Sequence, residues 1–107
     1  MATRRYEKYY SLTKGNTNTV RISVCYDLGD YRKKRGYYLS MGPCDYKREN
    51  GFIITEIIPS SGYRFLIKEL KRDSQKAFDE AVKFAEENAK ILFESWFPEL
   101  ETNWEEI

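Results

Sequence analysis

The longest regular pattern in the chain lies near its C-terminus, between Ser74 and Phe97. Apolar residues recur there at spacings of three and four, the repeat that places side chains on one face of an α-helix. They are Phe78, Ala81, Val82, Ala85, Ala89, Leu92, Phe93 and Trp96. Ser74 is suited to cap the first turn, and Pro98 disfavours helical backbone in the residue before it. The pattern predicts one continuous helix over residues 74–97.

A second apolar repeat runs beside this stripe. Ala77, Phe84 and Ile91 are seven residues apart, so the predicted helix is apolar over more than half of its circumference. Either another segment of the same chain covers Phe84 and Ile91, or a second copy of the chain or a foreign protein does. Both residues are therefore candidate contact residues, and homodimer formation through them stays open.

Alternation of apolar and polar residues before the helix predicts β-strands. The clearest example is residues 19–26, in which every second residue from Val20 to Tyr26 is apolar or aromatic. The predicted strands are residues 6–13, 19–26, 37–41 and 52–58. The polar segments between them are residues 14–18, 27–36 and 42–51. The first two strands are expected to form a hairpin, because Gly15 and Asn16 supply turn chemistry between them.

Residues 63–72 fit two patterns. Tyr63, Leu66 and Ile67 have helical spacing, whereas Tyr63, Phe65 and Ile67 alternate as in a strand. We favour a short helix, because residues 68–71 (KELK) have high helix propensity. That helix would be the cover for the Phe84 and Ile91 side chains.

These elements predict an α+β fold in a single domain over residues 1–107. We expect an antiparallel meander of three to four strands, packed against one long C-terminal helix. Residues 1–5 are expected to be a frayed N-terminus, and residues 98–107 an acidic tail. In a meander, the basic loop over residues 32–35 would lie at the opposite end of the sheet from the loop carrying Lys47 and Arg48.

The composition argues against catalysis. The chain has no histidine, the commonest general base, and neither Cys25 nor Cys44 has an evident activating partner or metal-ligand spacing. No glycine-rich phosphate loop is present. We therefore predict a non-enzymatic protein with no catalytic residues, no metal ligands and no cofactor. The lack of a signal-peptide pattern and of a long apolar segment predicts a cytoplasmic protein without a membrane partner.

The net charge of +1 conceals an asymmetry. Residues 1–55 carry eleven Lys or Arg against five Asp or Glu, whereas residues 56–107 carry seven against twelve. We expect a basic sheet half and an acidic helix half, and hence a folded molecule with a positive and a negative end.

The basic residues lie among aromatic ones, which favours binding of a partner. Tyr, Trp and Arg are the side chains that most often carry interface energy, and a basic loop beside aromatic rings also suits nucleic acid. A Tyr–Tyr pair on a strand would place one ring on each face, so the open sheet face near Arg21 would carry at least two rings. The candidate partner-binding residues are Arg21, Tyr31, Arg32, Lys33, Lys34, Arg35, Tyr38, Phe84, Ile91 and Trp104.

Three segments carry a resemblance: RISVCYDLG (residues 21–29), RGYYLSMGP (residues 35–43) and KRDSQKA (residues 71–77). They resemble a family of short, mostly uncharacterised proteins from conjugative elements and phages of Firmicutes, over about residues 20–85. The chain is shorter between the first two segments than the family pattern. Proteins of that setting include inhibitors of host defence, anti-CRISPR proteins among them. The resemblance implies a binding protein of a mobile genetic element, and it supplies no site residues.

The sequence therefore predicts a small non-enzymatic binding protein that inhibits or modulates a larger host protein or nucleoprotein, with an anti-CRISPR inhibitor as one form. The alternative is a nucleic-acid-binding module that uses the basic loop and the tyrosine-bearing sheet face.

Overall fold

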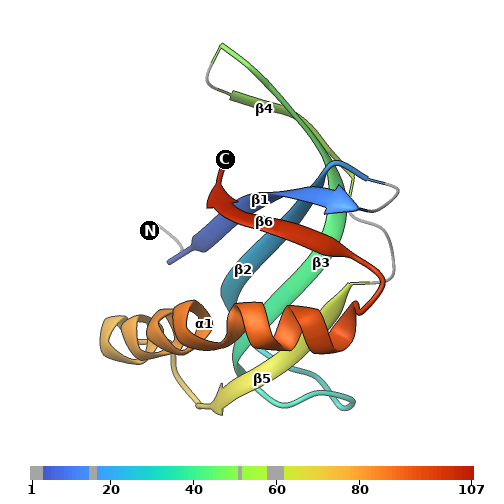
Figure 1. Ribbon diagram of the computed structural model, residues 1–107. Helices are drawn as coiled ribbons and strands as arrows, with labels where there is room; N and C mark the ends of the chain where they lie inside the picture. The colour runs from blue at the N-terminus through green and yellow to red at the C-terminus, as the bar shows by residue number, and fades with distance from the viewer. Residues whose placement is uncertain (1–3, 15–16, 51, 58–61) are drawn as a thin grey trace.

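The structure, a computed structural model, describes residues 4–14, 17–50, 52–57 and 62–107. In these ranges the chain forms six strands and one helix. They are β1 (Tyr6–Lys14), β2 (Thr19–Asp27), β3 (Gly36–Glu49), β4 (Phe52–Ile57), β5 (Tyr63–Glu69), α1 (Gln75–Trp96) and β6 (Glu101–Glu106). All strand pairs are antiparallel, and α1 lies across one face of the sheet (Figure 1). The α+β class and the single long helix are as predicted.

The sheet is organised around β3. Five strands form the main sheet in the order β5-β3-β2-β1-β6, among the residues described. The first part of β3 lies between β2 and β5, whereas its last part, from Asp45 to Glu49, pairs with β4. The β3–β4 hairpin therefore extends beyond the helix-covered sheet (Figure 1). It lies at the opposite end of the sheet from the β2–β3 loop, as a meander requires.

The helix begins and ends close to the predicted residues. The Ser74 hydroxyl accepts a hydrogen bond of 3.1 Å from the Ala77 N–H, which caps the first turn. At the other end, the Phe97 N–H donates to the Phe93 carbonyl, and Pro98 follows. The helix packs on the sheet through alanines at a spacing of four residues, which lets its backbone approach the strands closely. They are Ala77, Ala81, Ala85 and Ala89, all buried.

The core lies between α1 and one face of β2 and β3. The predicted inward positions of these strands are buried: Val20, Ile22, Val24, Tyr37, Leu39 and Met41. On the helix, Phe78 and Phe93 flank the alanines and complete the same cluster. Burial of this apolar surface is the main term that holds the helix to the sheet.

The prediction of a short helix over residues 63–72 is wrong, because residues 63–69 form strand β5. Gly36 to Met41 of β3 pair with this segment, and these backbone hydrogen bonds decide between two patterns that the side chains fit equally. Phe65 pairs with Leu39 and lies on the helix-facing side of the sheet, as the alternating pattern requires.

Three other segments also differ from the prediction. Residues 42–49 continue β3 instead of forming a loop, and the acidic tail contains β6, which pairs with β1. The sheet therefore has more strands than the three or four predicted. At the N-terminus, Arg4 is held by Asp73 and Gln75 at the start of the helix. The predictions for residues 1–3, 15–16, 51 and 58–61 lie outside the described residues.

Several ion pairs join the basic and acidic halves of the chain. Arg4 Nη1 lies 2.8 Å from Asp73 Oδ2, and Lys8 Nζ lies 3.6 Å from Glu106 Oε2. The Lys34 ammonium lies 3.7 Å from the Glu69 carboxylate. The fold thus brings opposite charges of the two halves together, which reduces the separation into a positive and a negative end that the sequence suggests.

Candidate functional site

The conformation of the loop between β2 and β3 is fixed by hydrogen bonds from its backbone N–H groups to two aspartate side chains. The Asp27 carboxylate accepts from the Gly29 N–H at 2.7 Å, and Asp30 Oδ1 accepts from the Arg32 N–H at 2.7 Å and the Lys33 N–H at 3.1 Å. Gly29 has a φ of +72°, and a Cβ at this position would lie 2.7 Å from the Lys33 carbonyl oxygen. The turn therefore requires glycine, and its geometry is set before any partner binds.

Three of the four basic side chains of this loop are engaged by carboxylates or backbone carbonyls of their own chain. Lys33 Nζ lies 2.9 Å from Asp27 Oδ2, and Lys34 faces Glu69. The Arg35 guanidinium donates to the Leu28 carbonyl at 2.9 Å and lies 3.4 Å from that of Lys71. Hydrogen bonds from Lys33 and then from the Gly29 N–H hold the pKa of Asp27 below its ordinary value, so its carboxylate stays ionised to lower pH than a free aspartate.

The tip of the loop presents Leu28, Tyr31 and Arg32 to solvent. Leu28 is 67% exposed and Tyr31 87%, and Tyr31 is the most exposed large apolar side chain in the part of the chain described. The Arg32 guanidinium carbon lies 5.0 Å from the centre of the Tyr31 ring, and its Nε donates to the Tyr31 hydroxyl at 2.8 Å. We call these three residues the loop tip. It combines an apolar, an aromatic and a cationic group on a rigid support.

The tyrosines of the open sheet face do not form an exposed surface. By strand register, Tyr9 and Tyr38 lie on the face away from the helix, as predicted, but each is only 7% exposed. The Tyr38 hydroxyl donates to the Lys34 carbonyl at 2.6 Å, and the Arg64 guanidinium covers its ring. Arg21 is half-buried and lies 3.3 Å from the Glu7 carboxylate. Base stacking on this face, as the nucleic-acid interpretation requires, would need these rings to be uncovered.

The two helix positions outside the main stripe have different environments. Phe84 is half-buried and stacks on Phe65 of β5, with ring centres 5.7 Å apart and an interplanar angle of 4°. Ile91 is 67% exposed. A segment of the same chain therefore covers Phe84, as one of our two alternatives held, but the covering element is a strand.

Trp104 belongs to β6 and packs on its own domain. Its ring lies 5.2 Å from that of Tyr10 and 5.6 Å from that of Phe93, the latter edge to face. The side chain is half-buried, and the role of Trp104 as a partner contact stays a prediction. Trp104 also forms one wall of a cavity that the sequence analysis did not identify.

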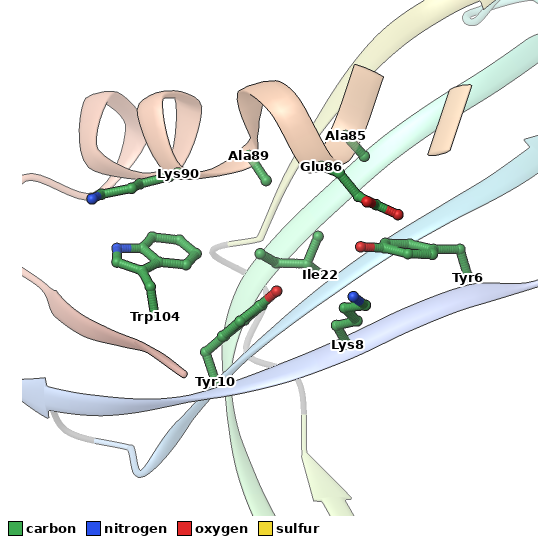
Figure 2. A pocket seen from close by; sticks show the side chains of 9 residues that line it. All are labelled: Tyr6, Lys8, Tyr10, Ile22, Ala85, Glu86, Ala89, Lys90 and Trp104. Carbon is green, nitrogen blue, oxygen red and sulfur yellow. The ribbon is translucent and has the colours of Figure 1, made fainter. Parts of the chain in front are cut away.

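This cavity is a groove of about 300 Å³ between α1 and strands β1 and β6. Its lining residues are Tyr6, Lys8, Tyr10, Ile22, Ala85, Glu86, Ala89, Lys90 and Trp104. Figure 2 shows the Tyr6 and Tyr10 hydroxyls, the Lys8 ammonium and the Glu86 carboxylate around a common space. The signal in the sequence is Lys8, which occupies an inward position of an alternating strand where an apolar residue is expected.

A second cavity, of about 360 Å³, lies on the open face of the sheet. It is lined by Arg4, Arg5, Glu7, Arg21, Ser23, Val24 and Cys25. Glu7 lies 3.3 Å from both Arg5 and Arg21, and Arg4 is held by Asp73, so the guanidinium groups have carboxylate partners within the chain.

Comparisons with protein families, with curated proteins and with solved structures find no match to this chain. Within the ranges that the structure describes, no helix combines the length and apolar character of a membrane span. The same ranges contain no group of three or more His, Cys, Asp or Glu side chains placed to hold a metal ion. Cys44 is buried and Cys25 half-buried, and the two do not form a disulfide.

Proposed function

We propose that this chain is a small non-enzymatic binding protein of a mobile genetic element, and that it modulates a larger protein or nucleoprotein through its loop tip. The observation that supports this most directly is the combination at Tyr31: a large ring 87% exposed, with a guanidinium stacked on it. Solvent exposure of such a side chain on a rigid turn has no evident role in stability. Tyr and Arg are the residues in which binding energy is most often concentrated.

Preorganisation strengthens this proposal. Because Asp27, Gly29 and Asp30 fix the backbone of the loop, a partner would not have to order it on binding, and less conformational entropy would be lost. The resemblance to proteins of conjugative elements and phages suggests the setting, in which inhibitors of host defence such as anti-CRISPR proteins are found. That the partner is a larger host protein or nucleoprotein is part of the same proposal.

Direct binding of nucleic acid is less well supported. Lys33, Lys34 and Arg35 are engaged by Asp27, Glu69 and backbone carbonyls, and neutralising phosphates would require these contacts to be given up. Tyr38, the other aromatic candidate near the basic run, is buried.

The test is capture of a partner from lysate of the native host, identified by mass spectrometry and followed by calorimetric titration. The variant Tyr31→Ala/Arg32→Ala removes two of the three loop-tip side chains, and Ile91→Ala/Lys83→Ala is the matched control on the exposed helix face. We expect the loop variant to raise Kd by about 30-fold, the effect of losing a hot spot of about 2 kcal/mol, and the control to leave Kd nearly unchanged.

The reverse result, in which the helix variant loses the partner and the loop variant keeps it, would contradict the assignment of the interface to the loop. Tight, salt-dependent binding of naked DNA or RNA in a mobility-shift assay would instead support the nucleic-acid module.

A further inference from the structure

The groove beside α1 has an apolar end with fixed walls. Trp104 and Tyr10 form one side, and Ile22 of β2 forms part of the base (Figure 2). The Trp104 ring is held from behind by the edge-to-face contact with Phe93, which is buried. Ala89 lies opposite, and its small side chain leaves room between the helix and the sheet. These walls suit a flat, apolar group.

The other end of the groove is polar and carries both charges. Lys8 points to the helix side because it pairs with Ile22, and its side chain is only 31% exposed. Its Nζ lies 5.5 Å from the centre of the Tyr6 ring. Glu86 reaches into the same space from the helix (Figure 2). A partly buried cation on the inward face of a sheet is costly unless it has partners, and the Tyr6 ring and the Glu106 carboxylate are the partners of Lys8 within the chain.

The ionisation states of this end are well defined at neutral pH. Burial raises the pKa of Tyr6 and of Tyr10 above the ordinary value, so both hydroxyls remain hydrogen-bond donors. Desolvation works against the charge of Lys8, but its charged surroundings, with the carboxylates of Glu106 and Glu86 among them, outweigh it and raise the Lys8 pKa. The groove therefore offers an ammonium and two phenol donors beside a carboxylate.

Charge complementarity restricts what this end can bind. A simple anion would meet Glu86, and also Glu106, which lies 3.6 Å from Lys8. A simple cation would meet Lys8, which already occupies the face of Tyr6. A molecule with a carboxylate and an ammonium on the same carbon atom gives each charge a partner of opposite sign. The contact of Lys8 with Glu106 is a weak obstacle, since Glu106 is 51% exposed and such ion pairs contribute little.

We propose that the groove is a binding site for an aromatic α-amino acid. The ring lies between Trp104 and Ala89, the carboxylate accepts from Lys8 and the Tyr6 and Tyr10 hydroxyls, and the ammonium faces Glu86. A volume of about 300 Å³ accommodates a ligand of this size. The site lies on the β1–β6 side of the helix and does not depend on the loop tip, so its failure would leave the proposed function untouched.

Calorimetry and NMR titration of the full chain with L-phenylalanine and L-tryptophan test the ligand class. We expect saturable binding with Kd below about 1 mM. 3-Phenylpropanoate lacks the ammonium, 2-phenylethylamine lacks the carboxylate and L-alanine lacks the ring. Each should bind at least about tenfold more weakly, because each loses a charge-assisted hydrogen bond or the apolar contact. Equal binding of 3-phenylpropanoate or of 2-phenylethylamine, or no saturation by either amino acid, would overturn the proposal.

Matched variants locate the ligand. Lys8→Met and Glu86→Gln should each weaken binding of L-phenylalanine by about tenfold or more, whereas Lys14→Met and Glu87→Gln on the same two elements should not. Lys14 and Glu87 are exposed and do not line the groove. Unchanged thermal unfolding of Lys8→Met separates loss of ligand from loss of fold. Retention of full affinity by both groove variants would contradict the site.

Discussion

The Tyr37 hydroxyl connects the centre of the sheet to the first turn of α1. Its ring is fully buried in the core, and its hydroxyl hydrogen-bonds to the Asp73 carboxylate and accepts from the Ser74 N–H at 3.0 Å. Ser74 in turn caps the helix. Burial, followed by the contact with Asp73, raises the pKa of Tyr37 from 10.0 to about 12. The Tyr37 side chain thus fixes where the helix begins. Its ionisation makes the stability of this contact depend on pH.

Replacing Tyr37 by Phe should lower the free energy of unfolding by about 1–2 kcal/mol, because buried polar groups lose their partner. It should also change the response to alkali. Since the folded-state pKa of Tyr37 is raised, its contribution is complete below pH 10 and is lost as the pH rises toward about 12. Urea unfolding at neutral pH and across this window measures both effects.

We expect the decline in stability between pH 10 and about 12 to be shallower in Tyr37→Phe than in the wild type. Some decline should remain, because the pKa values of Tyr6 and Tyr10 are raised as well. Tyr31→Phe is the control, because it removes a hydroxyl from an exposed ring and should leave both quantities unchanged. An equal slope in both variants would contradict the assigned role of Tyr37.

At the scale of elements, the sequence predicts the helix and the strands whose own side-chain pattern specifies their structure. The helix follows from its apolar repeat and its cap, and β2 from strict alternation between Val20 and Tyr26. Strand β5 could not be predicted in this way, because the unpaired edge of β3 selects it. The burial of Tyr38 follows from the same cause: β5 pairs beside it and supplies Arg64.

The candidate site was predictable to a similar degree. Tyr31 and Arg32 are identified by residue type and loop position, and the structure adds that Lys33 to Arg35 are engaged by the chain. The groove depends on β6, which no alternation marks, since Trp104 is the one large apolar residue of that strand. Lys8 at an inward position of β1 was the available signal.

Gly29 can be used to test whether the β2–β3 loop is preorganised. Gly29→Ala should lower the free energy of unfolding by about 1–3 kcal/mol, because the positive φ and the close Lys33 carbonyl leave no room for a Cβ. It should also weaken partner binding without removing any exposed side chain. Lys34→Ala is the control, as its ion pair is exposed and contributes little. Unchanged stability in Gly29→Ala would mean that the loop is not preorganised.

At the scale of the molecule, the fold is closed by contacts between its two ends. β6 pairs with β1, and the Ile107 N–H donates to the Tyr9 carbonyl at 2.9 Å. The N-terminal Arg4 reaches the start of α1. These contacts join residues far apart in the sequence, so we expect the domain to unfold as one cooperative unit.

The two thiols allow this expectation to be tested. Cys44 is fully buried with Tyr9, whereas Cys25 is half-buried, and both lie on the sheet face away from α1. In a Cys25→Ser variant, Cys44 should react with a thiol reagent only in the globally unfolded state, at a rate proportional to the equilibrium population of that state. Adding Tyr37→Phe on the opposite face should then accelerate the reaction by about 5- to 30-fold, matching its loss of stability. An unchanged rate would show that β3 opens locally at Cys44, and that the two faces of the sheet are not one cooperative structure.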